Sequence, residues 1–212
     1  MTSTVSGNSD SVPFAGDSRW RAAGAQVASV ARFEQVIDAL RIVQDRVAGA
    51  NPPESELVEV AEKLDEVGRA LAVFQVPETE QVIGHLDVPG RGQSLVPAFH
   101  VDRADDNSVG GRVSFSRFYL GGGGAAHGGA IPLVFDEVLG RLANAGGRIR
   151  SRTAYLHVNY RAITPLDEEL TLEARFDSEE GRKRFLSAEL RKGDVVLADA
   201  EGLFVALREG QP

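Results

Sequence analysis

The sequence contains no cysteine, which excludes disulfide bonds, a thiol nucleophile and a thiolate metal site. It has no run of about 18 apolar residues, the length that a membrane-spanning helix needs, so we expect no membrane span. The N-terminal stretch has neither a basic start nor an apolar segment, so no signal peptide is visible and a cytoplasmic location is expected. A net charge of −8 disfavours nucleic acid or an anionic membrane surface as the main partner.

Sequence motifs of several common enzyme classes are also missing. No GK[ST] follows the glycines at 121–124, which excludes a P-loop, and no G-x-S-x-G occurs, which excludes a serine-hydrolase elbow. Gly121, Gly123 and Ala126 match a loose dinucleotide fingerprint, but no acidic residue lies about 20 positions beyond them. The four histidines show no HExxH spacing, so no metal site is expected.

The length and composition fit one globular domain with an appendage. The chain has 212 residues, of which 42% are hydrophobic and 25% charged, and can therefore bury a core. We divide it into a flexible tail at 1–20, a helical hairpin at 21–75, a linker at 76–93 and a main domain at 94–208.

Two stretches with apolar residues at helical spacing, 30–47 and 57–74, predict the helices of the hairpin. The run Gly49–Pro53 breaks the pattern between them, and Ser55 is placed to cap the second helix. A hairpin of about 55 residues is small for a core of its own. We therefore expect it to pack on the rest of the chain or on a second subunit.

The main domain is organised around residues 121–142, which read GGGGAAHGGAIPLVFDEVLGRL. The glycines predict a loop, and Pro132 fits the first turn of a helix that follows it. Asp136 and Glu137 fall off the apolar stripe of this helix. The loop and helix start would supply backbone N–H groups that stabilise an oxyanion, with a possible base further along. The stripe consists of Ile131, Val134, Phe135, Val138, Leu139 and Leu142.

Strand patterns lie on both sides of this helix. Two strands, at 94–101 and 109–120, precede it, and four follow, the last at about 195–207. The later strands are joined mostly by short turns, including one at Ser178–Gly181, and short turns require antiparallel neighbours. The pattern predicts an α+β fold in which an antiparallel sheet packs on one helix.

The first strand after the helix shows a clean period of two. The alternation places Ala154, Leu156, Val158 and Tyr160 on the face toward the helix, where they would pack on its apolar stripe. It places Thr153 on the opposite face, together with Asn159 and Arg161.

The segment HGGAIPLVFD at 127–136 resembles the signature of the hotdog-fold thioesterases of the PaaI-like (4HBT-type) superfamily. The segments TAYLHVNY at 153–160, Pro165-Leu166 and EGRK at 180–183 resemble the branch that contains the THEM4-type acyl-CoA thioesterases. The resemblance covers about 92–207 and leaves out the helical hairpin. It implies a hotdog fold, an antiparallel sheet wrapped around one long central helix.

The resemblance also implies roles for individual residues. Asp136 would be the catalytic carboxylate, acting as base on water or as nucleophile, and Thr153 would position the water. The amide of Gly129, with Gly128 beside it, would form the oxyanion hole, and His127 would fix this loop. Glu137 is expected to be solvated. The CoA part of the substrate would be held by Asn159, Arg161, Arg182 and Lys183.

The function implied is hydrolysis of acyl-CoA thioesters to free acid and CoA, with no cofactor and no metal. The resemblance places the site between two subunits, which implies a homodimer or a dimer of dimers. The alternative is a non-catalytic acyl-CoA-binding hotdog protein, a sensor or scaffold, which the presence of both Asp136 and Thr153 disfavours. Gly121 stands where phenylacetyl-type members place an asparagine, which favours the Asp/Thr version of the site.

Overall fold

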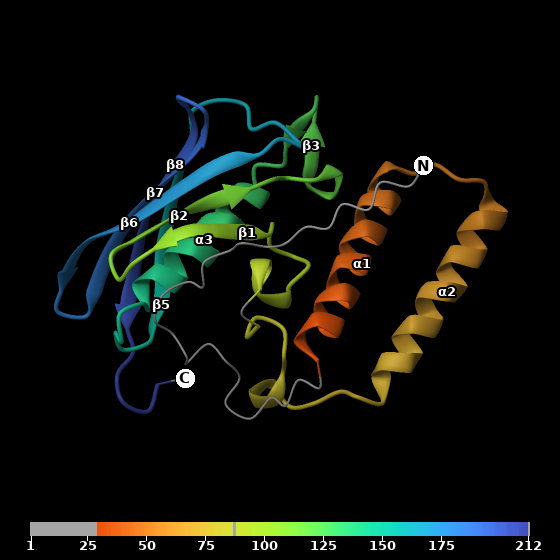
Figure 1. Cartoon of the computed structure of the whole chain (residues 1–212), viewed down its shortest axis with the longest axis horizontal. Helices are drawn as coiled ribbons and strands as arrows, with labels where there is room; N and C mark the ends of the chain where they lie inside the picture. Colours follow the sequence, from red (N-terminus) through yellow and green to blue (C-terminus); the bar gives the residue numbers. More distant parts are fainter. Residues whose placement is uncertain (1–28, 87, 212) are drawn as a thin grey trace.

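The computed structural model describes residues 29–86 and 88–211, so the predicted tail at 1–20 lies outside the described residues. Six strands of this part form one antiparallel sheet, and α3 lies against one of its faces (Figure 1). The helices α1 and α2 stand to one side of this body. The prediction of an α+β fold with an antiparallel sheet around one helix is confirmed.

The strand order across the sheet is β1-β2-β6-β7-β8-β5, and each neighbouring pair is antiparallel. The edge strand β5 pairs with β8 alone in the described part of the chain, so its outer row of backbone groups is open. The strands are β1 Phe99–Ala104, β2 Ser108–Val113, β5 Ser151–Tyr160, β6 Leu170–Glu180, β7 Lys183–Lys192 and β8 Val195–Ala206.

The core lies between the sheet and α3, which spans Ala130–Ala143. The six residues of the predicted stripe are at most 3% exposed. The facing side of the sheet is apolar as well, and includes Leu172, Ala188 and Phe204. Each fully buried Leu or Phe side chain stabilises the fold by about 1.5–3 kcal/mol. A Cβ at Gly202 would lie 2.8 Å from the Phe204 ring, so glycine is required where the helix approaches the sheet.

The glycine run forms a small hairpin before the helix. Strand β3 (Leu120–Gly122) pairs with β4 (Ala125–Ala126), and the turn between them has positive φ at Gly123 and Gly124. The four glycines therefore form a tight turn. The residues that lead directly into α3 are His127 to Gly129.

The α1 and α2 helices confirm two of the predicted helical stretches. The first, α1, spans Val30–Gly49 and lies against the short 3-10 helices Pro89–Gly92 and Arg117–Tyr119. The second, α2, spans Glu54–Ala72 and has no buried residue. The predicted cap by Ser55 is wrong, because Pro53 occupies the N-cap and Ser55 lies inside the first turn.

Three boundaries differ from the sequence pattern. The first strand begins at Phe99 rather than at 94, and the second ends at Val113 rather than at 120. Phe115 is fully buried outside any strand, so its apolar character extended the alternation beyond the true end. The turn expected at Ser178–Gly181 falls two residues later, because β6 and β7 stay paired up to the Glu180–Lys183 pair.

Candidate active site

The site centres on one hydrogen bond between α3 and β5. The Thr153 hydroxyl donates to Oδ1 of Asp136 at 2.9 Å, and both side chains are solvent-accessible. These two residues are 17 positions apart in the sequence, and the packing of the helix on the edge strand brings them together. The arrangement places a carboxylate and a hydroxyl where both can contact one water molecule.

A β-bulge in β5 determines on which face of the sheet the Thr153 side chain lies. The register shifts between Thr153, which pairs with Phe204, and Tyr155, which pairs with Leu203. Because Phe204 is a core residue, Thr153 lies on the helix side of the sheet, whereas Asn159 pairs with Asp199 on the other side. The predicted shared face of Thr153, Asn159 and Arg161 is therefore wrong. Ala154 and Tyr160, predicted to pack on the stripe of α3, are exposed.

A cavity of about 180 Å³ adjoins Asp136 and Thr153. Most of the residues that line it have polar side chains, and Phe204 and Gly140 are the apolar exceptions. The other lining residues are Arg91, Glu137, Arg141, Asn144, Ser151 and Arg152.

Glu137 is not solvated, contrary to the sequence-based expectation. Its carboxylate lies 3.2 Å from Nη1 of Arg91, and these side chains are only 14% and 10% exposed. Arg141 lies one turn along the helix at 4.0 Å. Arg91 also donates to the carbonyl of Gly84 from its Nε at 2.7 Å. The sequence offered no signal for this pairing, since Arg91 lies 46 residues before Glu137 in a loop-like segment.

The helix start forms a second polar centre. The Gly129 N–H donates to Nδ1 of His127 at 2.9 Å, which agrees with the expectation that His127 fixes this loop. The Tyr160 hydroxyl donates to the carbonyl of Gly128 at 2.7 Å and so ties the helix start to the end of β5. In one chain Gly129 lies seven residues from Asp136, about 10 Å along α3.

Asn159 and Arg161 share one carboxylate on the outer side of the sheet. Asn159 donates to Oδ1 of Asp199 at 2.8 Å, and Nε of Arg161 donates to Oδ2 at 2.5 Å. The hydrogen bond from Arg161, followed by the one from Asn159, lowers the pKa of the Asp199 carboxyl, although burial opposes the shift. A phosphate that binds Arg161 would compete with Asp199 for it.

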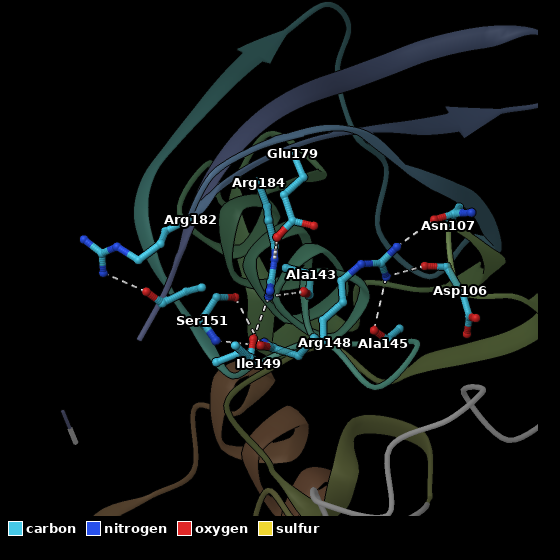
Figure 2. Close-up of polar contacts among 12 residues, drawn as sticks. Asp106, Asn107, Ala143, Ala145, Arg148, Ile149, Ser151, Glu179, Arg182 and Arg184 are labelled. Carbon is cyan, nitrogen blue, oxygen red and sulfur yellow. Dashed lines mark hydrogen bonds and ion pairs between the residues drawn. The ribbon is translucent and has the colours of Figure 1, made fainter. Parts of the chain in front are cut away.

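Arg182 and Lys183 lie at the other end of β8. Lys183 pairs with Val205, six residues from Asp199, which corresponds to about 20 Å along the strand. Arg182 donates to the carbonyl of Ala206 at 2.9 Å (Figure 2). One chain therefore does not bring the four predicted CoA-binding residues together.

The end of α3 near Arg182 is held by a second arginine. Arg184 is 3% exposed and donates through Nη1 to the carbonyls of Ala143 and Ile149, at 2.8 and 2.7 Å. Its Nε donates to Glu179 at 3.0 Å (Figure 2). Because Ala143 is the last helical residue, Arg184 caps the negative end of the helix.

Within residues 29–86 and 88–211, no group of three or more His, Cys, Asp or Glu side chains is arranged to hold a metal ion. Among the helices of this same part, none is both long and apolar enough to cross a bilayer.

Comparisons with known proteins agree with this geometry. The thioesterase superfamily model matches residues 123–198. A solved structure of a thioesterase superfamily protein is 32% identical with a TM-score of 0.71, over 82% of this chain and 94% of the other. A hypothetical thioesterase from Streptococcus pneumoniae, solved with coenzyme A, is 17% identical with a TM-score of 0.50 over 54% and 89% of the two chains, which shows the fold alone. The chain belongs to the thioesterase superfamily, and its fold is the hotdog.

Two curated relatives are acyl-coenzyme A thioesterases of the THEM4 type. The one from Bos taurus is 37% identical over 86 residues, which is 40% of this chain and 35% of the relative. The one from Rattus norvegicus is 31% identical over 91 residues, 42% of this chain and 39% of the relative. These matches span little more than a third of the relatives' length.

Proposed function

We propose that this protein hydrolyses acyl-CoA thioesters to the free acid and CoA, without metal or cofactor. The observation that carries the proposal is the hydrogen bond of 2.9 Å between Thr153 and Asp136 at the edge of a cavity. Membership of the thioesterase superfamily and the likeness to THEM4-type thioesterases support the same reaction.

The reaction follows from the chemistry of the two side chains. Asp136 takes a proton from a water molecule that the Thr153 oxygen helps to hold, and the water oxygen attacks the thioester carbon. Asp136 itself can instead attack as nucleophile, after which water hydrolyses the acyl-enzyme. In both routes the carbon–sulfur bond breaks and the CoA thiolate leaves and takes up a proton.

The carbonyl oxygen gains negative charge during attack and needs a fixed donor. The Gly129 N–H, at the positive end of α3, is the proposed donor, and the oxygen would replace Nδ1 of His127 as its acceptor. One such donor is worth about 3–4 kcal/mol in the transition state.

In this proposal the donor and the base come from two copies of the chain. Gly129 and Asp136 lie seven residues apart on α3, about 10 Å of helix rise, so we place the donor and the base of one site in different copies. The open edge of β5 offers a way to join two copies by antiparallel pairing. A two-fold axis near the middle of β5 would place Thr153 of one copy opposite Tyr160 of the other, and Tyr160 holds the helix start.

The same pairing of β5 strands would also bring the proposed CoA-binding residues of the two copies close together. Arg182 and Lys183 of one copy would approach Asn159 and Arg161 of the other, because the two pairs lie at opposite ends of β8. Arginine suits the phosphates of CoA.

We expect Arg182→Ala to raise KM for acyl-CoA more than it lowers kcat, and we expect the rise in KM to be smaller at high salt.

The test is turnover of a graded panel of acyl-CoA thioesters by the purified protein. Wild type should release free thiol, and Asp136→Asn should lose at least about 100-fold in kcat while keeping its melting temperature and its CoA affinity. Asp65→Asn, on the exposed face of α2, is the matched control. Tight acyl-CoA binding with no turnover by wild type would instead establish a non-catalytic binding protein.

A further inference from the structure

An apolar stripe on α2 is open to solvent along the whole helix. Five residues recur at alternating spacings of three and four and are 40–57% exposed. In Figure 1, α2 lies at the margin of the molecule, beside α1 and away from the sheet. Folded soluble proteins rarely leave a regular stripe of this length uncovered. We call these residues the α2 seam: Leu57, Val60, Leu64, Val67 and Leu71.

The spacing of the α2 seam indicates the kind of surface that covers it. Alternating steps of three and four are the pattern of a helix that packs along its length on another helix. Ala61 and Gly68 flank the seam, and a Cβ at Gly68 would meet nothing within 4 Å. Small residues at such positions allow a neighbouring helix to approach closely.

The polar side of α2 disfavours an anionic membrane or nucleic acid as the occupant of the seam. It carries six carboxylates and two cations, Lys63 and Arg69, which gives the helix a net charge of −4. Helices that bind anionic membranes or nucleic acid carry lysine and arginine on the polar side instead. An acidic helix with a regular seam fits a protein partner.

The exposed apolar area of the α2 seam can be compared with the area that a stable protein interface buries. The five half-exposed seam residues offer roughly 350 Å² per copy, whereas a stable interface buries about 800 Å² per partner. Val36, Leu40 and Val47 share one side of α1 and are 41–58% exposed, so they add to the apolar area that the two helices offer to a partner.

We propose that the arm formed by α1 and α2 packs on the arm of a second copy of this chain, forming a four-helix bundle. The two α2 seams lie antiparallel at its centre, because a two-fold axis brings the same patch of each copy into contact. The antiparallel arrangement also keeps the acidic first turns, with Glu54 and Glu56, apart. This contact does not depend on the proposed hydrolase activity.

The absence of cysteine permits a direct test in the full-length protein. Leu64→Cys places a single thiol near the centre of the α2 seam, and Glu62→Cys places one on the polar side as the matched control. Mild oxidation, or a short bis-maleimide linker, joins two thiols only when their Cα atoms come close. We expect most of the Leu64→Cys protein to form a covalent dimer of twice the chain mass, and at least five-fold less of the Glu62→Cys protein.

Two results would overturn the proposal. Equal cross-linking of both variants would indicate random collision, and absence of a dimer with Leu64→Cys would show that something other than a second α2 covers the seam. Far-UV circular dichroism and a thermal melt confirm that both variants are folded. Because the readout is a covalent bond at α2, it does not change if the β5 pairing or the hydrolase activity proves wrong.

Discussion

At the scale of single residues, the surroundings of Thr153 differ from those of a β-branched residue that only supports a strand. Its hydroxyl donates to Asp136, and its exposed side chain contributes little to the core. The hydroxyl therefore matters to the orientation of the carboxylate and of a water molecule rather than to the fold.

We expect Thr153→Val to lower kcat by about 10- to 1,000-fold, roughly 1.4–4 kcal/mol, because one aligned hydrogen bond is lost in the transition state. Valine keeps the shape, so the melting temperature should change little. Steady-state kinetics beside a thermal melt provide the measurement. Thr171→Val, on the exposed face of β6, is the control, and wild-type kcat for Thr153→Val would reject the role.

Glu137 is the neighbouring carboxylate, and its environment differs from that of Asp136. It is mostly buried and contacts Arg91 and Arg141, so its charge is balanced within the protein. Removal of one partner from a buried pair leaves the other charge uncompensated.

We predict that Arg91→Met lowers the free energy of unfolding by about 2–4 kcal/mol. The double variant Arg91→Met, Glu137→Gln should recover part of this loss, because it removes the uncompensated charge as well. Urea denaturation of wild type, the two single variants and the double variant gives the coupling energy. Additive effects would show that the two residues act independently.

At the scale of elements, both ends of α3 are fastened to the sheet. Tyr160 holds the start through the Gly128 carbonyl, and Arg184 holds the end through the Ala143 carbonyl. Asp136 lies between these two attachments, so its position relative to β5 depends on both. The buried arginine also satisfies the Ile149 carbonyl, which otherwise loses its hydrogen bond (Figure 2).

We expect Arg184→Met to destabilise the protein by about 2–4 kcal/mol, since it leaves two carbonyl groups and Glu179 without their donor. Arg191→Met is the control, because its pair with Glu189 is 34% and 43% exposed and should be worth at most about 1 kcal/mol. Denaturant unfolding measures both. Equal effects of the two substitutions would contradict the capping role.

At the scale of the whole molecule, the proposed site needs two copies of the chain. Gly129 and Asp136 lie seven residues apart on α3, which corresponds to about 10 Å of helix rise. Antiparallel pairing of the two β5 strands would bring the amide of one copy near the carboxylate of the other.

This arrangement predicts complementation between two inactive variants. Asp136→Asn removes the base, and Gly129→Pro removes the N–H at a residue whose φ of −72° suits proline. In a mixed dimer one of the two sites keeps both wild-type groups. A random mixture should therefore recover about one quarter of wild-type activity, because half of the dimers are mixed.

Activity of mixed and unmixed variants is measured after joint refolding or co-expression with two affinity tags. Gly129→Ala, which keeps the N–H, should remain active alone and serves as the control. If mixing recovers nothing although mixed dimers are isolated, the donor and the base act within one chain.

The sequence by itself determined the elements and the core. The helical spacing of the stripe from Ile131 to Leu142 defined α3 and its buried side, and short turns required antiparallel strands. The histidine–glycine–glycine entry and the carboxylate at 136 marked the candidate site. These properties depend on local periodicity, which a single sequence displays directly.

The tertiary structure decided which side chains meet at the site, which local periodicity does not predict. The bulge in β5 reverses the expected side of Thr153, because one extra residue shifts every side chain before it to the opposite face. The pairing of Arg91 with Glu137 joins residues 46 positions apart, and no local pattern marks such a contact. Packing between distant segments determines where the side chains of a site point, because the local sequence is compatible with more than one backbone arrangement.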